Sequence, residues 1–249
     1  MQGGRADAAF KANVDSIVVF KNQGLIDTFN GRLARLHEQR QLNSGTSLFN
    51  GRLDDAALSS AELGEKRATY GRLQRLFVDT DMGPSSGAGA KIALMWHGVP
   101  SDAVADAIFK TGLSSRVSNQ DEGYFGKGVY LTPEAEYAAF YANGQAPPKR
   151  GATYTLLLCA VCLANPDPLT RGVDYDPSSS PAISKFHYNY GAVGTAKALA
   201  GGSDAHFVAV SVREGWQAAT KVVDADYHEL VVNDEQQVLP FAKVVVRIK

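Results

Sequence analysis

The sequence predicts an α+β protein with antiparallel sheets, and two features of its organisation support this class. The first ninety or so residues carry helix-like patterns, whereas short strands and short helices mix from residue 91 onward. The second part lacks regular strand–helix–strand alternation, which favours antiparallel sheets over a doubly wound parallel one. The 249 residues are 45% hydrophobic and 20% charged, an ordinary globular composition. This length can bury a sizeable core.

The N-terminal part is predicted to be largely helical. Within "FKANVDSIVVFKNQGLIDTFNGRLARLHEQRQ", the apolar residues near helical spacing are Val14, Ile17, Val18, Leu25, Phe29, Leu33 and Leu36. Gly24 punctuates this stretch, and "NSG" at 43–45 is expected to end it. A second helical stretch covers about 56–77, and residues 81–91, rich in Gly and Ser, read as a linker or exposed loop.

Strands and short helices are predicted in turn after residue 90. The expected strands are 91–96, 128–132, 153–163, 206–212, 228–234 and 237–248. A helix follows Ser101 as N-cap and stops at Gly112. Another has Thr132 as N-cap and Pro133 at its first position. Residues 166–204 carry prolines, serines and glycines and are expected to form a long, partly irregular excursion.

Charge and hydropathy exclude several classes of function. The net charge of −1 gives the whole chain no bias toward polyanions, which argues against general nucleic-acid binding. No apolar run is long enough for a transmembrane helix, and the first sixteen residues lack the apolar core of a secretory signal. We therefore expect an intracellular protein, cytoplasmic or nuclear, that is monomeric and does not act at a membrane.

Cys159 and Cys162 form a lone C-x-x-C within an apolar run that reads as a buried strand. Side chains three apart in a strand point to opposite faces, which does not suit a redox or zinc pair. We interpret both as core cysteines that pack as small apolar residues. No metal site is expected among the five histidines.

Several residues have both a structural and a chemical interpretation. His97 ends a strand and precedes Gly98, whose backbone a ligand could approach closely; the alternative is a surface turn. Tyr130 and Tyr141 could stack on a flat ring, although Tyr137 and Tyr141, one helical turn apart, also fit an aromatic core.

Two charged residues are equally ambiguous. Lys127, between two glycines, could hold a phosphate or could be a solvated loop lysine, since the P-loop pattern is absent. Glu229 lies among apolar strand residues and is either an edge charge facing water or a site residue. His228 beside it is expected on the opposite strand face and is interpreted as structural.

Three ordered blocks resemble the poly(ADP-ribose) polymerase-like ADP-ribosyltransferase catalytic domain. The blocks are "LMWHG", "GYFGKGVYLTPEAEYAAFYA" and "YHELVVNDEQQVLPFAKVVVRI", and "FKNQGLIDTFNGRL" resembles the helix that opens the domain. The resemblance implies a split β-sandwich that binds NAD⁺ through a His–Tyr–Glu set. It also implies a tail at 1–13 and one catalytic domain at 14–249. That domain would have a helical part at 14–90, with an insertion at 41–90, and an NAD-binding core at 91–249.

The resemblance also implies a role for each matching residue. His97, Tyr130 and Glu229 would form the catalytic set, with His97 bonding the adenosine ribose and Glu229 the 2′-hydroxyl of the nicotinamide ribose. Gly98 would hold the nicotinamide carboxamide through its backbone, and Tyr130 and Tyr141 would sandwich the nicotinamide ring. Gly126–Lys127–Gly128 would let the backbone turn close to the nicotinamide pocket.

One position departs from the pattern of many relatives. A serine that bonds the nicotinamide amide is replaced here by Ala138. The missing donor is worth about 0.5–1.5 kcal/mol of NAD⁺ affinity. We expect neither the autoinhibitory helical bundle nor the zinc fingers of DNA-dependent members, and therefore no activation by DNA breaks.

The implied function is transfer of ADP-ribose from NAD⁺ to a macromolecular acceptor with release of nicotinamide. We favour mono-ADP-ribosylation of a protein, with a nucleic-acid acceptor as the alternative, because segment 166–204 is unlike that of long-chain polymerases. The other readings are an NAD⁺ glycohydrolase, a poly(ADP-ribose) synthase and an inactive module that binds NAD⁺ or a partner.

Overall fold

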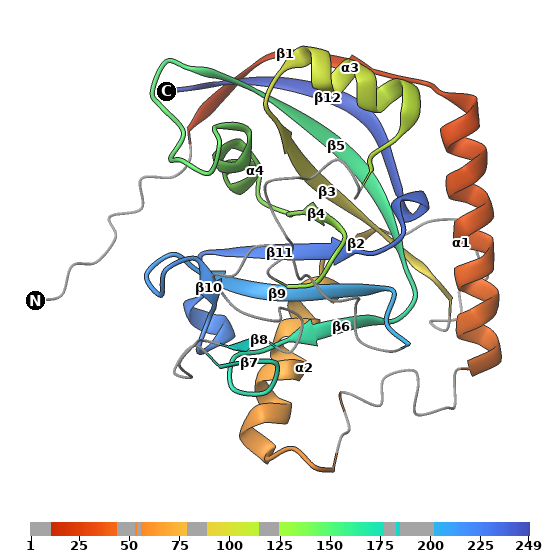
Figure 1. Cartoon of the computed structure of the whole chain (residues 1–249), viewed down its shortest axis with the longest axis vertical. Helices are drawn as coiled ribbons and strands as arrows, with labels where there is room; N and C mark the ends of the chain where they lie inside the picture. Colours follow the sequence, from red (N-terminus) through yellow and green to blue (C-terminus); the bar gives the residue numbers. More distant parts are fainter. Residues whose placement is uncertain are drawn as a thin grey trace, which may run out of the picture.

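The computed structural model describes residues 11–43, 53, 56–78, 89–114, 125–176, 183–184 and 202–249. Two five-stranded, mostly antiparallel sheets form the frame of this part of the chain, and four α-helices flank them (Figure 1). The prediction of an α+β fold built on antiparallel sheets is therefore confirmed.

The first sheet has the strand order β1-β12-β5-β3-β2 and is antiparallel throughout. Its strands are β1 (Ala12–Val19), β12 (Val238–Ile248), β5 (Thr153–Leu163), β3 (Lys91–Val99) and β2 (Phe77–Val78). The C-terminal strand β12 lies inside the sheet between β1 and β5, so the two ends of the chain are joined by backbone pairing.

The second sheet has the order β10-β9-β11-β4, with β6 added in parallel to β9. Its strands are β10 (Gln217–Ala218), β9 (Ala205–Ser211), β11 (Tyr227–Val232), β4 (Val129–Leu131) and β6 (Pro166–Leu169). A separate pair comprises β7 (Tyr175–Asp176) and β8 (Ile183–Ser184). Two short 3₁₀ turns, η2 (Val222–Asp224) and η3 (Glu235–Gln237), flank β11.

The two sheets meet where β3 passes β4. The backbone N–H of Trp96 donates to the carbonyl of Thr132 at 2.7 Å, and the N–H of Thr132 donates back to Trp96 at 3.0 Å. Among the described residues, this backbone bridge links the two sheets. The main apolar core joins buried residues of both sheets, among them Met95 and Leu157 of the first and Phe207 and Leu230 of the second.

The helices are α1 (Gln23–Asn43), α2 (Ser60–Gln74), α3 (Asp102–Thr111) and α4 (Ala135–Ala142). In Figure 1, α1 stands upright at the side of the first sheet, where it contacts β5 and β12, while α2 lies beside β6 and β9 of the second. Helix α2 is held there by Lys66, which is 2% exposed and forms an ion pair of 2.8 Å with Asp174. Helix α2 therefore packs against the second sheet.

Local signals predicted α3 correctly. The Oγ of Ser101 accepts a hydrogen bond from the N–H of Val104, and Gly112 ends the helix with φ of 84°. This positive φ suits glycine because a Cβ would crowd the backbone in that region. Asp102–Thr111 therefore form the predicted helix, with Ser101 as its N-cap and Gly112 as its stop.

The prediction that helix extends through Val14, Ile17 and Val18 is wrong. These residues form β1, which pairs with β12. They are 58%, 62% and 41% exposed, so the strand has no buried face that would produce an alternating hydrophobic pattern in the sequence. The helix begins at Gln23, and the "NSG" signal at 43–45 agrees with its end at Asn43.

Helix α4 begins later than predicted. Its N-cap is Glu134 rather than Thr132, and Pro133 precedes the helix. Thr132 is held extended by its bridge to Trp96, so the chain cannot turn helical there. The hydroxyl of Thr132 still accepts the N–H of Glu134 at 3.1 Å.

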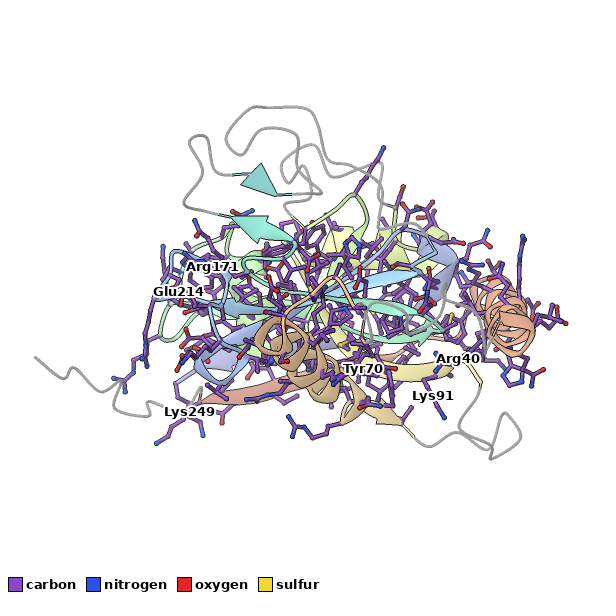
Figure 2. All side chains as sticks on the ribbon, turned by 90° about the horizontal axis from the view of Figure 1, so that it is seen from below. Arg40, Tyr70, Lys91, Arg171, Glu214 and Lys249 are labelled. Carbon is purple, nitrogen blue, oxygen red and sulfur yellow. The ribbon has the colours of Figure 1, made fainter. Side chains whose placement is uncertain are left out.

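The excursion at 166–204 contains more regular structure than predicted at its start, since β6 pairs with β9. Arg171 after β6 forms an ion pair with Glu214, which follows β9, and Figure 2 shows the two side chains next to each other. Residues 177–182 and 185–201, like 1–10 and most of the predicted linker at 81–91, lie outside the described residues.

Cys159 and Cys162 are fully buried and free, and they belong to different apolar clusters. Burial raises the pKa of Cys162 to about 12, which suppresses thiolate formation. Their interpretation as core cysteines is confirmed.

Candidate active site

A cavity of about 960 Å³ lies where the two sheets meet. Strands β3 and β4, helices α3 and α4, and Glu229 of β11 contribute to its wall. Its lining comprises Trp96, His97, Gly98, Pro100, Ala103, Val104, Ala107, Ile108, Thr111, Gly112, Leu113, Ser114, Gly128, Val129, Tyr130, Leu131, Thr132, Tyr137, Ala138, Tyr141, Gly144, Gln145 and Glu229. The volume is at the upper end of what small-molecule and cofactor sites occupy.

Gly98 presents its backbone on the side of β3 that faces β4. In a strand, residues i and i+2 direct their N–H and C=O groups to the same edge. Trp96 uses these groups to bond Thr132, and the strand pairing between β3 and β4 ends there. The N–H and C=O of Gly98 therefore point toward the same edge, beside the cavity that Gly98 lines.

Only glycine fits at position 98 without movement of α4. A Cβ built on Gly98 would lie 1.9 Å from the carbonyl oxygen of Ala138 and 2.9 Å from the N of Ala142. These contacts are with helix backbone, which cannot give way as a flexible side chain can. Gly98 thus lets α4 approach β3 closely and brings Tyr141 to the cavity.

His97 is oriented by the backbone of β4. Its Nδ1 lies 2.8 Å from the carbonyl oxygen of Tyr130. Since a carbonyl only accepts, Nδ1 carries the proton and Nε2 is the acceptor of the neutral ring. Burial lowers the pKa of His97, partly opposed by the bond to Tyr130, so the neutral ring is favoured.

Tyr130 forms hydrogen bonds with the loop immediately before β4. Its hydroxyl donates to the carbonyl of Gly126 at 2.7 Å and accepts the N–H of Phe125 at 3.0 Å. The carbonyl of Phe125 is bonded in turn by Nδ1 of the buried His206 at 2.7 Å. This loop is therefore fixed at both of its ends.

The glycines around Lys127 allow close backbone approach, as the sequence suggested. Gly126 has φ of 115°, and a Cβ on Gly128 would lie 2.3 Å from the carbonyl oxygen of Val232 on β11. Gly128 lines the cavity, whereas Lys127 is exposed and does not. A phosphate contact from Lys127 stays a prediction.

Glu229 is a buried carboxylate in the cavity wall. It is 4% exposed and lies on β11, opposite Val208 of β9. The hydroxyl of Tyr141 donates to its Oε1 at 2.8 Å, and the hydroxyl of Tyr137 donates to the same oxygen. A buried carboxylate needs such partners because burial without hydrogen bonds is costly.

The structure thus brings most of the predicted site residues together. His97, Gly98, Tyr130, Ala138, Tyr141 and Glu229 all line the cavity. The alternatives of a surface turn for His97 and a solvent-facing edge charge for Glu229 do not fit this arrangement. Within "GYFGKGV", Gly123 and Tyr124 lie outside the described residues.

Two contributors near the site were not predicted from the sequence. Tyr137 was weighed only as an aromatic core residue, yet its hydroxyl reaches Glu229 across 92 residues of chain. Glu134 binds His228, and the resulting tie joins α4 to β11. Single-sequence spacing gave no signal for either contact, because each depends on how α4 packs against the second sheet.

The chain has a counterpart among known protein families. It matches the family described as "PARP: Poly(ADP-ribose) polymerase catalytic domain" over residues 72–242. This match covers more than half of the 249 residues, so the chain belongs to the poly(ADP-ribose) polymerase catalytic-domain family. Members of this class are ADP-ribosyltransferases that use NAD⁺. A search of curated proteins finds no match.

Two features are absent from the described part of the chain. None of its helices is long and apolar enough to cross a membrane. No group of three or more His, Cys, Asp or Glu side chains in it could hold a metal ion.

Proposed function

We propose that this chain transfers a single ADP-ribose unit from NAD⁺ to a macromolecular acceptor, preferentially a protein, and releases nicotinamide. The observation that carries the proposal is the buried carboxylate of Glu229 in one cavity with His97, Tyr130 and Tyr141. These four residues come from β3, β4, α4 and β11, in the chain order that the family resemblance implies.

His97 and Gly98 bind NAD⁺ in this proposal. The neutral imidazole, with Nδ1 committed to Tyr130, offers Nε2 as an acceptor for a hydroxyl of the adenosine ribose. The backbone N–H and C=O of Gly98 form a donor–acceptor pair that suits the nicotinamide carboxamide. Support comes from the direction of these groups, toward the edge of β3 beside the cavity.

Tyr130 and Tyr141 hold the nicotinamide ring between them. Both rings line the cavity, and each hydroxyl is anchored, that of Tyr130 on Gly126 and that of Tyr141 on Glu229. Anchored rings hold a flat substrate in its reactive geometry, which lowers the entropic part of the barrier. Ala138 lines the same space but contributes no hydroxyl.

Glu229 assists cleavage of the bond between nicotinamide and ribose. As in glycoside cleavage, this bond breaks through an oxocarbenium-like state with positive charge on the ribose. The carboxylate accepts a hydrogen bond from the 2′-hydroxyl and stabilises the growing charge. The acceptor nucleophile then bonds to the anomeric carbon as nicotinamide leaves with the electron pair of the broken bond.

Transfer of one unit rather than a chain is the finer part of the proposal. It is supported by the composition of residues 166–204, which carry prolines, serines and glycines and differ from the acceptor-side segment of long-chain polymerases. The net charge of −1 favours a protein over a nucleic acid as acceptor.

The test is nicotinamide release from NAD⁺ by the purified chain, with and without a cell lysate. Glu229→Gln removes the charge and keeps the shape. Glu136→Gln is the matched control, because this glutamate lies on α4 and does not line the cavity. Labelled NAD⁺ reports on the acceptor, and phosphodiesterase digestion of the labelled product distinguishes single units from chains.

We expect release by the wild type and by Glu136→Gln, and a loss of at least a hundredfold for Glu229→Gln. Lysate-dependent release with labelled protein supports transfer. Release without any labelled macromolecule would instead indicate an NAD⁺ glycohydrolase. Labelled nucleic acid or labelled chains would overturn the acceptor or the single-unit proposal, and no release in either condition would leave a binding module.

A further inference from the structure

Helix α4 directs two phenols at one carboxylate oxygen. Tyr137 and Tyr141 lie one turn apart, and both hydroxyls donate to Oε1 of Glu229. Tyr137 is 1% exposed and lines the cavity together with Glu229. The hydroxyl of Tyr137 is therefore inside the candidate active site rather than in a remote apolar core.

The ring of Tyr137 packs against two nearly parallel aromatic rings. It stacks on Tyr227 with ring centroids 4.7 Å apart and an interplanar angle of 9°. It also lies 5.6 Å from Trp216 at 14°. Tyr227 stands two residues before Glu229 on β11. The strand that carries the Glu229 carboxylate therefore also carries the ring on which Tyr137 stacks.

Tyr137 can act only as a neutral donor at this position. Burial raises its pKa far above the usual 10, and the neighbouring charge of Glu229 raises it further. A neutral phenol donates its proton in a hydrogen bond to an ionised carboxylate. Such a bond favours the ionised form of the acid.

We propose that Tyr137 is a positioning residue that fixes the orientation of Glu229 and keeps its carboxylate ionised. This inference rests on the proposed function for the role of Glu229 in catalysis. Tyr137 acts through Glu229 and is assigned no contact with NAD⁺. Tyr141 has both tasks, because its ring is also proposed to stack on nicotinamide.

Among the described residues, four elements contribute titratable groups near Glu229. Helix α4 contributes Tyr137 and Tyr141, β3 contributes His97 in the same cavity, and β4 contributes Tyr130. Tyr227 precedes Glu229 on β11, and the paired residue on β9 is Val208. Burial lowers the pKa of His97 below the usual 6.5, and a His97→Gln background separates any contribution of this ring from that of Glu229.

Tyr137→Phe tests the proposal because it removes the hydroxyl and keeps the stacked ring. We expect kcat for nicotinamide release to fall roughly ten- to a hundredfold, with KM for NAD⁺ changed by less than about threefold. The acidic limb of the kcat profile should move to higher pH, because Glu229 loses a donor to its ionised form. A merely structural role would not move this limb.

Tyr154→Phe is the matched control. Tyr154 is 8% exposed, its hydroxyl accepts the N–H of Lys149 at 2.8 Å, and it does not line the cavity. It loses a hydrogen-bonded phenol hydroxyl from a buried ring, as Tyr137→Phe does. We expect wild-type kcat, KM and pH profile from this variant.

Carboxyl NMR titration of ¹³C-labelled glutamate gives a readout that does not require activity. Loss of one signal in Glu229→Gln assigns the residue, and Tyr137→Phe should raise its titration midpoint by about one pH unit. Unchanged titration in a folded Tyr137→Phe variant overturns the proposal, even if the wild type is inactive. If the wild type is inactive but Tyr137→Phe still raises the titration midpoint of Glu229, the proposed function is refuted and the positioning role of Tyr137 stands.

Discussion

Glu134 at the start of α4 is bonded twice by His228 of β11. Its Oε1 lies 2.7 Å from the ring Nδ1, and its Oε2 accepts the backbone N–H of His228 at 3.1 Å. The hydroxyl of Thr132 donates to the same Oε2 at 2.7 Å. Because Glu229 follows His228 directly, this tie sets the position of the carboxylate relative to the tyrosines of α4.

Glu134→Ala should therefore weaken both the fold and the site. It leaves the N–H and ring of the buried His228 without these partners, which costs about 1–3 kcal/mol of unfolding free energy. Urea unfolding and nicotinamide release measure the two effects. Glu136→Ala, two residues along α4, is the control and should keep both values. Equal stability of the two variants would show that the tie contributes nothing.

The contact between β3 and α4 gives a second prediction. Gly98→Ala would place a methyl group 1.9 Å from the carbonyl oxygen of Ala138, so α4 must shift. We expect a loss of about 1–3 kcal/mol in unfolding free energy, together with loss of NAD⁺ binding. Chemical denaturation and calorimetric titration with NAD⁺ are the measurements.

Gly64→Ala is the matched control for that change. Gly64 lies in α2, and a Cβ there meets nothing within 4 Å. Alanine should stabilise this helix by about 0.5–1 kcal/mol and leave NAD⁺ binding unchanged. If Gly98→Ala kept wild-type binding, the close approach of α4 to β3 would not matter for the site.

The sequence predicted which residues lie together in the cavity better than it predicted the local elements around them. His97, Tyr130 and Glu229 were predicted to lie together because they stand in three ordered blocks that resemble a family pattern. The prediction of a helix over Val14 and Ile17 was wrong because this segment is an edge strand. Its exposed side chains give no hydrophobic periodicity that would identify it. Its structure is fixed instead by pairing with β12 at the other end of the chain.

Tyr137 was read as a core residue for a related reason. Its spacing from Tyr141 fits a helix whether the two rings face a core or a cavity. Only the packing of α4 against β11, some ninety residues further along, decides that its hydroxyl meets Glu229. Contacts between distant elements of this kind leave no periodic signal in one sequence.

Adding a hydroxyl at position 138 should increase nicotinamide affinity. Ala138 is 1% exposed and lines the cavity beside Tyr141. Ala138→Ser adds a donor for the carboxamide, and we expect a gain of about 0.5–1.5 kcal/mol, or roughly two- to tenfold in affinity. Inhibition of NAD⁺ cleavage by nicotinamide is the measurement.

Ala139→Ser is the control for the serine substitution. Ala139 is the next residue of α4, fully buried in the cluster with Leu156 and Val244, and it does not line the cavity. Its serine variant should lose stability without any change in nicotinamide affinity. An equal response of the two variants, or weaker inhibition of Ala138→Ser, would count against the proposed carboxamide position.

The buried imidazole of His97 should make stability depend on pH. Burial lowers its pKa below the usual 6.5, with the bond to Tyr130 opposing part of this effect. As pH falls through 6.5, the unfolded chain takes up a proton that the folded chain still excludes. The unfolded state then binds more protons, so the stability that the neutral ring contributes above pH 6.5 is progressively lost until the folded pKa is passed.

His97→Gln removes this titration and keeps a donor that can reach the carbonyl of Tyr130. The difference in unfolding free energy between wild type and His97→Gln should be constant from pH 8 to 7 and should shift against the wild type as pH falls from about 6.5 to 5. Urea unfolding at half-unit pH intervals measures it. A difference that stays flat across this range would mean that His97 has the same pKa in the folded and unfolded states. Burial would then not keep the ring neutral and could not support NAD⁺ binding in that way.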